Sequence, residues 1–217
     1  MKHNSRDFCC FDDTNNDENN SKNRRSYIGK IVSYTVIFSL LAEILFLCFY
    51  FGKKIQKYVY PKRFSEYVTE YCAEYGVPQA LIYATMKVES DFDSDAVSSA
   101  GACGIMQIMP KTFGEISELL SESVSDSDMF NTQINIKYGV LYLSMQYESF
   151  GCWEYAILAY NAGPQRVTEW LSDGKINVDD DKWDIPFEES AEYIKKIRRC
   201  ADKYSKIYDM EKIKWKS

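Results

Sequence analysis

Glu89 stands in a sequence context that favours acid–base chemistry. Ile82, Met86 and Glu89 are spaced so that they share one face of a helix that begins near Pro78. The negative end of the helix dipole and an apolar surrounding both disfavour a charged carboxylate, so both raise its pKa. A carboxyl group with a raised pKa can act as a general acid near neutral pH. The alternative, which the spacing permits equally, is a solvated glutamate at a helix end.

The composition excludes several other kinds of chemistry. The chain has one histidine, His3, which lies in a polar N-terminal stretch. Ser-His-Asp and Cys-His catalysis and histidine-bearing zinc sites are therefore excluded for the folded domain. No glycine-rich phosphate loop is present. The net charge is −6, with the acidic excess after residue 52, so no basic field favours a nucleic acid partner.

Four ordered blocks resemble the signature of the soluble lytic transglycosylases, which are lysozyme-like enzymes that cleave peptidoglycan and are related to goose-type lysozyme. The blocks are Glu89-Ser90 with SAGACGIMQIMP at 99–110, NIKYGVLYL at 135–143, AYNAGP at 159–164 and IPFEESAEYI at 185–194. The resemblance covers roughly residues 64–202. Ser190 replaces the usual threonine and keeps its hydroxyl. Ala191 replaces the usual arginine, so any contact of that arginine is missing here.

The resemblance implies a lytic transglycosylase that cleaves the β-1,4 bond between N-acetylmuramic acid (MurNAc) and N-acetylglucosamine (GlcNAc) and forms 1,6-anhydro-MurNAc. Glu89 would be the catalytic acid and then the base. The substrate-binding residues that it implies are Ser90, Met106, Gln107, Tyr160, Asn161, Glu189 and Tyr193. It implies no cofactor and no metal. Two alternatives stay open: a muramidase that hydrolyses the same bond, and an inactive scaffold module that binds peptidoglycan.

Several of these residues also have a purely structural interpretation. Met106 could be core filler, since methionine packs into irregular gaps. Asn161 could cap a helix, and Glu189 could be a first-turn acid favoured by the helix dipole. The alternating aspartates that follow Ser90 lack the glycine and distal glutamate of a calcium loop, so they are interpreted as turn formers. These are Asp91, Asp93 and Asp95.

The periodicity predicts a mostly α, lysozyme-like domain. Helices are expected at about 64–75, 78–89, 110–120, 131–149, 153–160 and 164–171, and from 188 past 200. Two connecting segments are polar: SESVSDSD at 121–128 and an acidic loop at 173–184. No alternation with the period of a β-strand stands out.

Residues 31–52 form an apolar run of 22 residues, and a transmembrane helix needs about 20. No small-x-small cleavage site follows, which favours an uncleaved signal anchor. Glu43 would cost about 2–3 kcal/mol in the membrane, offset by a partner helix or simply tolerated. The predicted organisation is a disordered cytoplasmic tail at 1–30, the anchor, a linker at 53–62 and a lytic transglycosylase domain at 63–217.

Function rather than charge sets the predicted orientation. Basic residues on the two flanks of the apolar run are nearly balanced, so the positive-inside rule does not decide. Peptidoglycan lies outside the membrane, and the catalytic domain is therefore expected to be extracytoplasmic. The chain would be a single-pass protein of a bacterial cell membrane. The sequence identifies no protein partner.

The cysteines of the predicted external domain form an even set: Cys72, Cys103, Cys152 and Cys200. An oxidising compartment permits at least one disulfide among them, with three possible pairings. Buried free thiols are the alternative, because free cysteine is often buried. The neighbours Cys9 and Cys10 are expected to be reduced.

Overall fold

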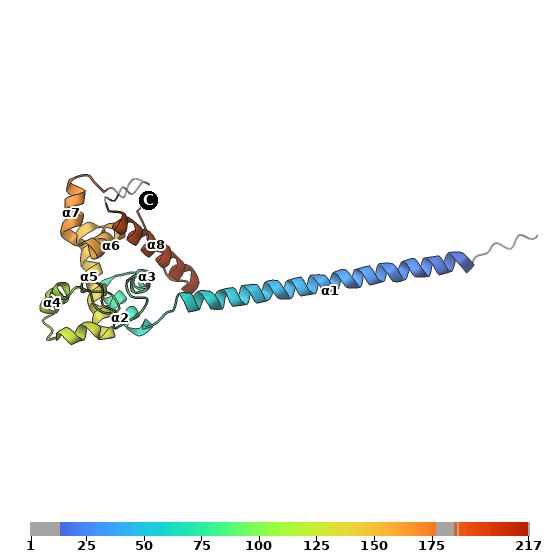
Figure 1. Ribbon diagram of the computed structural model, residues 1–217, viewed down its shortest axis with the longest axis horizontal. Coiled ribbons are helices and arrows are strands. Elements are labelled where there is room, and N and C mark those ends of the chain that lie inside the picture. The colour runs from blue at the N-terminus through green and yellow to red at the C-terminus, as the bar shows by residue number, and fades with distance from the viewer. Residues whose placement is uncertain (1–13, 177–184, 186, 217) are drawn as a thin grey trace, which may run out of the picture. The chain divides into compact units, whose positions relative to one another are not determined.

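The computed structural model describes residues 14–176, 185 and 187–216, and it divides into two compact units, Met1–Ile55 and Gln56–Ser217. The described part of the first unit is a single helix, α1 (Thr14–Val59), whose last residues belong to the second unit (Figure 1). Within α1, the 33 residues Tyr27–Val59 are long and apolar enough to cross a membrane, judged by length and composition.

α1 extends beyond the predicted anchor at both ends. It begins at Thr14, inside the stretch predicted to be disordered, and it ends at Val59, inside the predicted linker. The physical reason is that no proline interrupts residues 14–59, and adding residues to an existing helix costs little compared with starting one. Residues 1–13 of the predicted tail lie outside the described residues.

The second unit is built from helices, and Figure 1 labels the α-helices. In chain order they are α2 (Ser65–Tyr75), α3 (Gln79–Glu89), α4 (Pro110–Leu119), the 3₁₀ helix η1 (Asp126–Phe130), α5 (Thr132–Phe150), α6 (Trp153–Ala162), α7 (Pro164–Ser172) and α8 (Glu188–Tyr208). The mostly α prediction is confirmed, since the described residues contain only isolated β-bridges at Val97–Cys103 and Cys103–Ile108. The connector predicted at 121–128 differs, because Ser125 and Asp128 cap each other and start η1.

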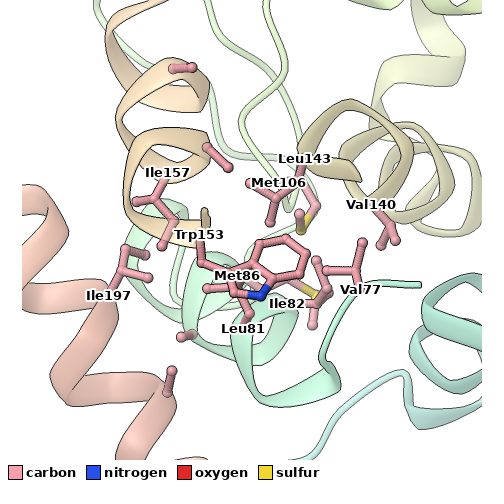
Figure 2. Close-up of a cluster of buried hydrophobic side chains, with 14 of the residues drawn as sticks. Val77, Leu81, Ile82, Met86, Met106, Val140, Leu143, Trp153, Ile157 and Ile197 are labelled. Atoms are coloured by element: carbon pink, nitrogen blue, oxygen red, sulfur yellow. The ribbon is translucent and has the colours of Figure 1, made fainter. Parts of the chain in front are cut away.

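α3 lies at the centre of the core. It packs against α8 and α2, while α5 packs against α2 and α6. Figure 2 shows Leu81, Ile82 and Met86 of α3 among side chains from the other helices, including Trp153 and Ile197. The three α3 side chains are completely buried. Burying an aliphatic side chain contributes roughly 1.5–3 kcal/mol, so the core fixes the position of α3 and of the glutamate that ends it.

The backbone after Glu89 stops α3 at once. Ser90 has a φ of −135°, and Asp91 and Phe92 have φ values of 53° and 67°, which is the left-handed region. The Phe92 side chain is buried, and its burial holds this unusual backbone in place. Glu89 is therefore the last residue of α3, and the loop that leads to α4 begins directly after it.

The four cysteines of the second unit form no disulfide, so the first of the two alternatives left open by the sequence is wrong. Cys72, Cys103, Cys152 and Cys200 are all free thiols, and all are buried in the hydrophobic core. Burial raises the pKa values of Cys72 and Cys200 to about 12, because an apolar surrounding disfavours the thiolate. The buried-thiol alternative holds for this set. Cys9 and Cys10 lie outside the described residues.

Candidate active site

The carboxyl group of Glu89 is held by one hydrogen bond from across the fold. The hydroxyl of Tyr193, on α8, donates to Glu89 Oε1 at 2.5 Å. Burial raises the pKa of Glu89 to about 7, and the hydrogen bond from Tyr193 opposes this shift because it stabilises the carboxylate. At neutral pH the protonated and ionised forms of Glu89 are therefore present in comparable amounts. A group in this state can both give and take a proton.

Two tyrosines border Glu89, and both remain protonated. Burial is the main cause that raises the pKa values of Tyr193 and Tyr160 well above normal, and the charge of Glu89 adds to it. The hydroxyl of Tyr160, on α6, donates to the backbone carbonyl of Met106 at 2.7 Å. Tyr193 thus serves as a donor to the carboxyl group, whereas Tyr160 joins α6 to the loop between α3 and α4.

Asn135, a buried residue of α5, fixes this loop. Its side-chain oxygen accepts from the backbone N–H of Met106 at 2.8 Å, and its amide nitrogen donates to the carbonyls of Cys103 and Met129 at 3.1 and 2.7 Å. Gly104 leaves room for this amide: its φ is 78°, and a Cβ there would lie 2.4 Å from Asn135 Nδ2. No functional role was predicted for Asn135, although it begins the second of the four sequence blocks.

The structure corrects the prediction for Met106. Its side chain is completely buried rather than lining a cleft. It packs against Gly139 of α5 so closely that a Cβ at position 139 would lie 2.8 Å from three of its atoms. Figure 2 shows Met106 among the core side chains, with Leu143 of α5 nearby. The core-filler alternative is therefore correct for the side chain, and the backbone of Met106 is the part that binds Tyr160 and Asn135.

The hydroxyl of Ser90 is already occupied by the loop. Ser90 Oγ donates to the carbonyl of Ile105 at 2.8 Å, with a longer contact of 3.3 Å to the carbonyl of Met86. It therefore ties the end of α3 to the loop that carries Gln107. An interaction of the same hydroxyl oxygen with substrate stays a prediction.

Gln107, Tyr160 and Asn161 line one pocket, and substrate binding by these residues stays a prediction. The pocket has a volume of 220 Å³ and is lined by Gln107, Ile108, Met109, Thr112, Tyr142, Tyr160, Asn161, Ala162 and Gly163. The side-chain nitrogen of Gln107 donates to the carbonyls of Ala96 and Gly104 at 3.0 and 2.9 Å. This leaves its amide oxygen, within the described chain, as the atom that can accept from a ligand.

Thr112 and Tyr142 are pocket residues for which no role was predicted. The ring of Tyr142 packs against that of Tyr160 with a centroid distance of 5.3 Å. Tyr142 lies in the same sequence block as Asn135, so the block itself was the available signal. Thr112 is in the first turn of α4, and nothing in its spacing marks it as a pocket residue.

Glu189 is a predicted site residue that does not line the pocket described above. It is exposed in the first turn of α8, and among the described residues it forms no hydrogen bond with Glu89 or Tyr193. Its neighbour Ser190 is buried, and its hydroxyl donates to Asn161 Oδ1 at 3.5 Å. Pro186 of the same block lies outside the described residues. No group of three or more candidate metal ligands occurs within the described part of the chain.

Comparison with known proteins identifies relatives whose matches include the second unit. A family model described as the transglycosylase SLT domain matches residues 66–182. The chain is 32% identical over 143 residues to the soluble lytic murein transglycosylase of Escherichia coli K12, covering 64% of this chain and 22% of that protein. It is 25% identical to the membrane-bound lytic murein transglycosylase C of Actinobacillus pleuropneumoniae serotype 5b (strain L20), covering 88% of this chain and 55% of that protein.

Solved structures agree on the fold. The 70 kDa soluble lytic transglycosylase of E. coli superimposes with a TM-score of 0.64 at 29% identity, covering 70% of this chain and 26% of that one. An inactive Glu-to-Gln mutant of the lytic transglycosylase Slt from Pseudomonas aeruginosa gives a TM-score of 0.63 at 29% identity, covering 72% of this chain and 26% of that one. The matched family model spans more than half of the sequence, and the chain belongs to the transglycosylase SLT domain family.

Proposed function

We propose that the chain is a peptidoglycan lytic transglycosylase that cleaves the MurNAc–GlcNAc β-1,4 bond and leaves 1,6-anhydro-MurNAc. The observation that carries the proposal is Glu89, a carboxyl group with a pKa of about 7 that Tyr193 holds at the end of α3. Membership of the SLT family supports it, as do the names of the relatives. The chain covers 22% of the length of the E. coli relative, so the activity is proposed for this domain on its own residues.

One carboxyl group can perform both proton transfers of this reaction. Protonated Glu89 donates its proton to the glycosidic oxygen while the bond from that oxygen to C1 of MurNAc breaks. The ionised Glu89 then accepts the proton of the MurNAc 6-hydroxyl, whose oxygen forms a new bond to C1. Glu89 ends protonated as it began, and no water is consumed. The 6-hydroxyl belongs to the substrate, so its effective concentration at C1 is high.

Hydrolysis usually needs a second carboxylate, either to attack C1 or to activate water. In the described chain, the candidates nearest in sequence are engaged or exposed. Asp91 is paired with Lys87, and the side chain of Asp93 accepts from the backbone N–H of Asp95 at 3.0 Å. Glu189 is exposed at the start of α8. These observations favour capture by the 6-hydroxyl over a muramidase reaction.

The remaining predicted residues are proposed to hold the sugar beside Glu89. The amide oxygen of Gln107 would accept from a sugar hydroxyl or acetamido N–H, and Asn161, which lines the same pocket, would form a further hydrogen bond. Tyr193 would hold the carboxyl group in place. Ser90 and Glu189 are kept as substrate contacts at the edges of the site, and Met106 would contribute through its backbone.

The proposed location is a bacterial cell membrane, crossed once, with the second unit outside. A helix that is long and apolar enough to span a membrane supports the anchor, as does the membrane-bound relative. The proposed organisation keeps the tail at 1–30, the anchor at 31–52, the linker at 53–62 and the catalytic domain at 63–217. The proposed partner of the domain is the glycan strand of peptidoglycan.

Digestion of purified peptidoglycan by the full chain in detergent tests the proposal. We expect products that end in 1,6-anhydro-MurNAc, one water lighter than hydrolysis products, by mass spectrometry. Glu89→Gln should reduce their release by at least about 100-fold, since it cannot transfer the proton. Glu70→Gln, the same change on the exposed face of α2, is the matched control and should leave it unchanged.

Each alternative function has its own result in this experiment. Products with mainly reducing MurNAc ends would replace the proposal with a muramidase. Binding to peptidoglycan without any products, in the wild type as in Glu89→Gln, would indicate the scaffold module.

A further inference from the structure

The outer face of α8 carries a stripe of cations that the active site does not use. Lys196, Arg199, Lys203 and Lys206 follow one another at spacings of three, four and three residues, which places them on one side of the helix. All four are exposed, and they line a surface pocket of 430 Å³ together with Tyr60 and Asp202. We call these four residues the α8 cationic face.

Within the described chain, the charge of Glu192 acts on Lys196 and Arg199 from a distance, but no carboxylate forms a close ion pair with the α8 cationic face. Among the described residues none of its four cations is in an ion pair, whereas the adjacent Lys195 pairs with Glu192 at 3.0 Å. Asp202 is the one acid that lines the pocket, and its side chain accepts from Trp215 Nε1 at 3.2 Å. Like charges three or four residues apart on a helix repel each other. The helix dipole favours a cation in the last turn, such as Lys206, but not Lys196 or Arg199 in the middle.

The pocket also includes the residue that follows α1 in the chain. Tyr60 comes directly after Val59, the last residue of the candidate membrane span. The hydroxyl of Tyr208 donates to the Tyr60 carbonyl at 2.7 Å, and that of Tyr204 donates to the Pro61 carbonyl at 3.0 Å. The rings of Tyr60 and Tyr204 pack edge to face at 5.6 Å. α8 is therefore bonded to the two residues at which the chain leaves the span.

We propose that the α8 cationic face binds the phosphate groups of anionic phospholipids in the leaflet from which α1 emerges. The proposal rests on the membrane anchoring proposed above. Connectivity favours a lipid over other phosphates, because Tyr60 lies in the short linker that follows the anchor at 31–52 and so stays near the bilayer whatever the angle between the two units. Tyrosine is common at the membrane–water interface, and each lysine or arginine near an anionic surface strengthens attachment about fivefold. Docking in this way would hold the domain against the bilayer.

Energy transfer from tryptophan to a dansyl-labelled lipid tests the proposal with the full chain. All four tryptophans follow the anchor in the sequence, so the transfer reports the approach of the second unit to the bilayer. The protein is placed in vesicles of phosphatidylcholine, with or without phosphatidylglycerol. We expect greater transfer with phosphatidylglycerol, and loss of the difference at high salt because salt screens exposed charges.

Two matched variants separate the α8 cationic face from net charge. Lys196→Gln, Arg199→Gln and Lys203→Gln together should lower the ratio of docked to undocked domain on the order of 100-fold. The control variant removes the same charges from exposed positions on α4, on α7 and after α7, through Lys111→Gln, Arg166→Gln and Lys175→Gln. It should retain the greater transfer with phosphatidylglycerol. Equal transfer by the two variants, or a phosphatidylglycerol effect in the wild type that salt does not change, would overturn the proposal.

Two further measurements distinguish the other outcomes. A soluble glycerol-phosphate polymer that binds through the same three residues, while phosphatidylglycerol has no effect, would replace the lipid with a polymer and overturn the proposal. Digestion of peptidoglycan fragments by the same preparations reports the proposed function separately. Digestion by a wild-type protein that does not dock would overturn the proposal for the α8 cationic face and leave the proposed function intact. Docking by a wild-type protein that does not digest would refute the proposed function and leave the proposal for the α8 cationic face intact.

Discussion

Two opposing influences set the proton affinity of Glu89. Burial beside the core raises its pKa, and the hydroxyl of Tyr193 lowers it by stabilising the carboxylate. The result is a group that changes charge near neutral pH, which suits a residue that must act first as an acid and then as a base. The same arrangement has a cost in stability, because a carboxyl group with a raised pKa in the folded state destabilises the fold as the pH rises above its pKa in the unfolded state.

Glu89→Gln is therefore expected to make the folded protein more stable at alkaline pH. The pKa of Glu89 rises from 4.5 to about 7 on folding. Below pH 4.5 both the folded and the unfolded states are protonated, and stability is unaffected. As the pH rises from 4.5 to 7, the unfolded state ionises first, and the folded wild type loses up to about 3 kcal/mol relative to the variant. Thermal unfolding at about pH 4 and about pH 8 measures the difference; an equal difference at both would contradict a raised pKa.

Tyr193→Phe should shift the pH dependence of the reaction rather than abolish it. Removing the hydroxyl removes the hydrogen bond that lowers the pKa of Glu89, so the pKa should rise further. We expect the alkaline limb of the profile of kcat/KM against pH to move to higher pH. Tyr142→Phe, a pocket residue without this hydrogen bond, is the control and should keep the wild-type limb. An unmoved limb in Tyr193→Phe would mean that another group sets the profile.

The loop between α3 and α4 takes its shape from α5. Asn135 accepts one hydrogen bond from the loop and donates another, and Gly139 makes room for Met106. The loop in turn carries Gln107 to the pocket, and Tyr160 binds it from α6. Residues of α5 that touch no substrate atom should therefore affect catalysis by positioning.

A pair of glycine substitutions tests this dependence. Gly104→Ala places a Cβ 2.4 Å from Asn135 Nδ2 and from the Met129 carbonyl, so the loop must move. Gly101→Ala has a similar φ of 86° but no atom within 4 Å of the new Cβ. Both pay the cost of a left-handed alanine, about 1–2 kcal/mol, and only Gly104→Ala adds the collision. Melting temperature and peptidoglycan digestion should fall clearly further in Gly104→Ala, and equal effects would refute the role of the collision.

The sequence predicted the helices of the second unit well because several of them have a clear start or stop signal. Gly76 and Gly151 end α2 and α5 in the left-handed conformation, and Pro110 and Pro164 begin α4 and α7. The bounds of α1 could not be predicted as well, because no such signal separates its apolar and polar parts. Local patterns mark helix ends reliably only where the backbone is forced to change.

The site was predicted in part, and the misses have a common cause. Glu89 was found from local spacing, but its contact with Tyr193 joins residues 104 positions apart. Whether a side chain faces the core or a pocket depends on such distant neighbours. Met106 looks the same in either role until Gly139 is placed beside it. Asn135 was missed for the same reason, since its three partners come from two other segments.

At the scale of the whole molecule, one chain joins a candidate membrane span to an SLT domain. Most of the span belongs to the first compact unit, and its last residues belong to the second unit, which contains the domain. On the proposed topology, protease added to intact protoplasts should digest the second unit and spare epitopes at residues 1–30. Protoplasts opened by detergent provide the control, in which both parts are digested. If the protease digested the tail and spared the second unit, the domain would lie inside the cell, where it could not reach peptidoglycan.

The four buried thiols of the second unit have a consequence for where and when this domain can fold. No pair of thiols within that set has to be oxidised to a disulfide before the core forms. Burial keeps Cys72 and Cys200 protonated and unreactive in the folded state. Maturation should then require neither an oxidoreductase nor molecular oxygen. The domain should reach the same structure in a reducing medium as in an oxidising one, and reductants used to strip cell walls should leave it active.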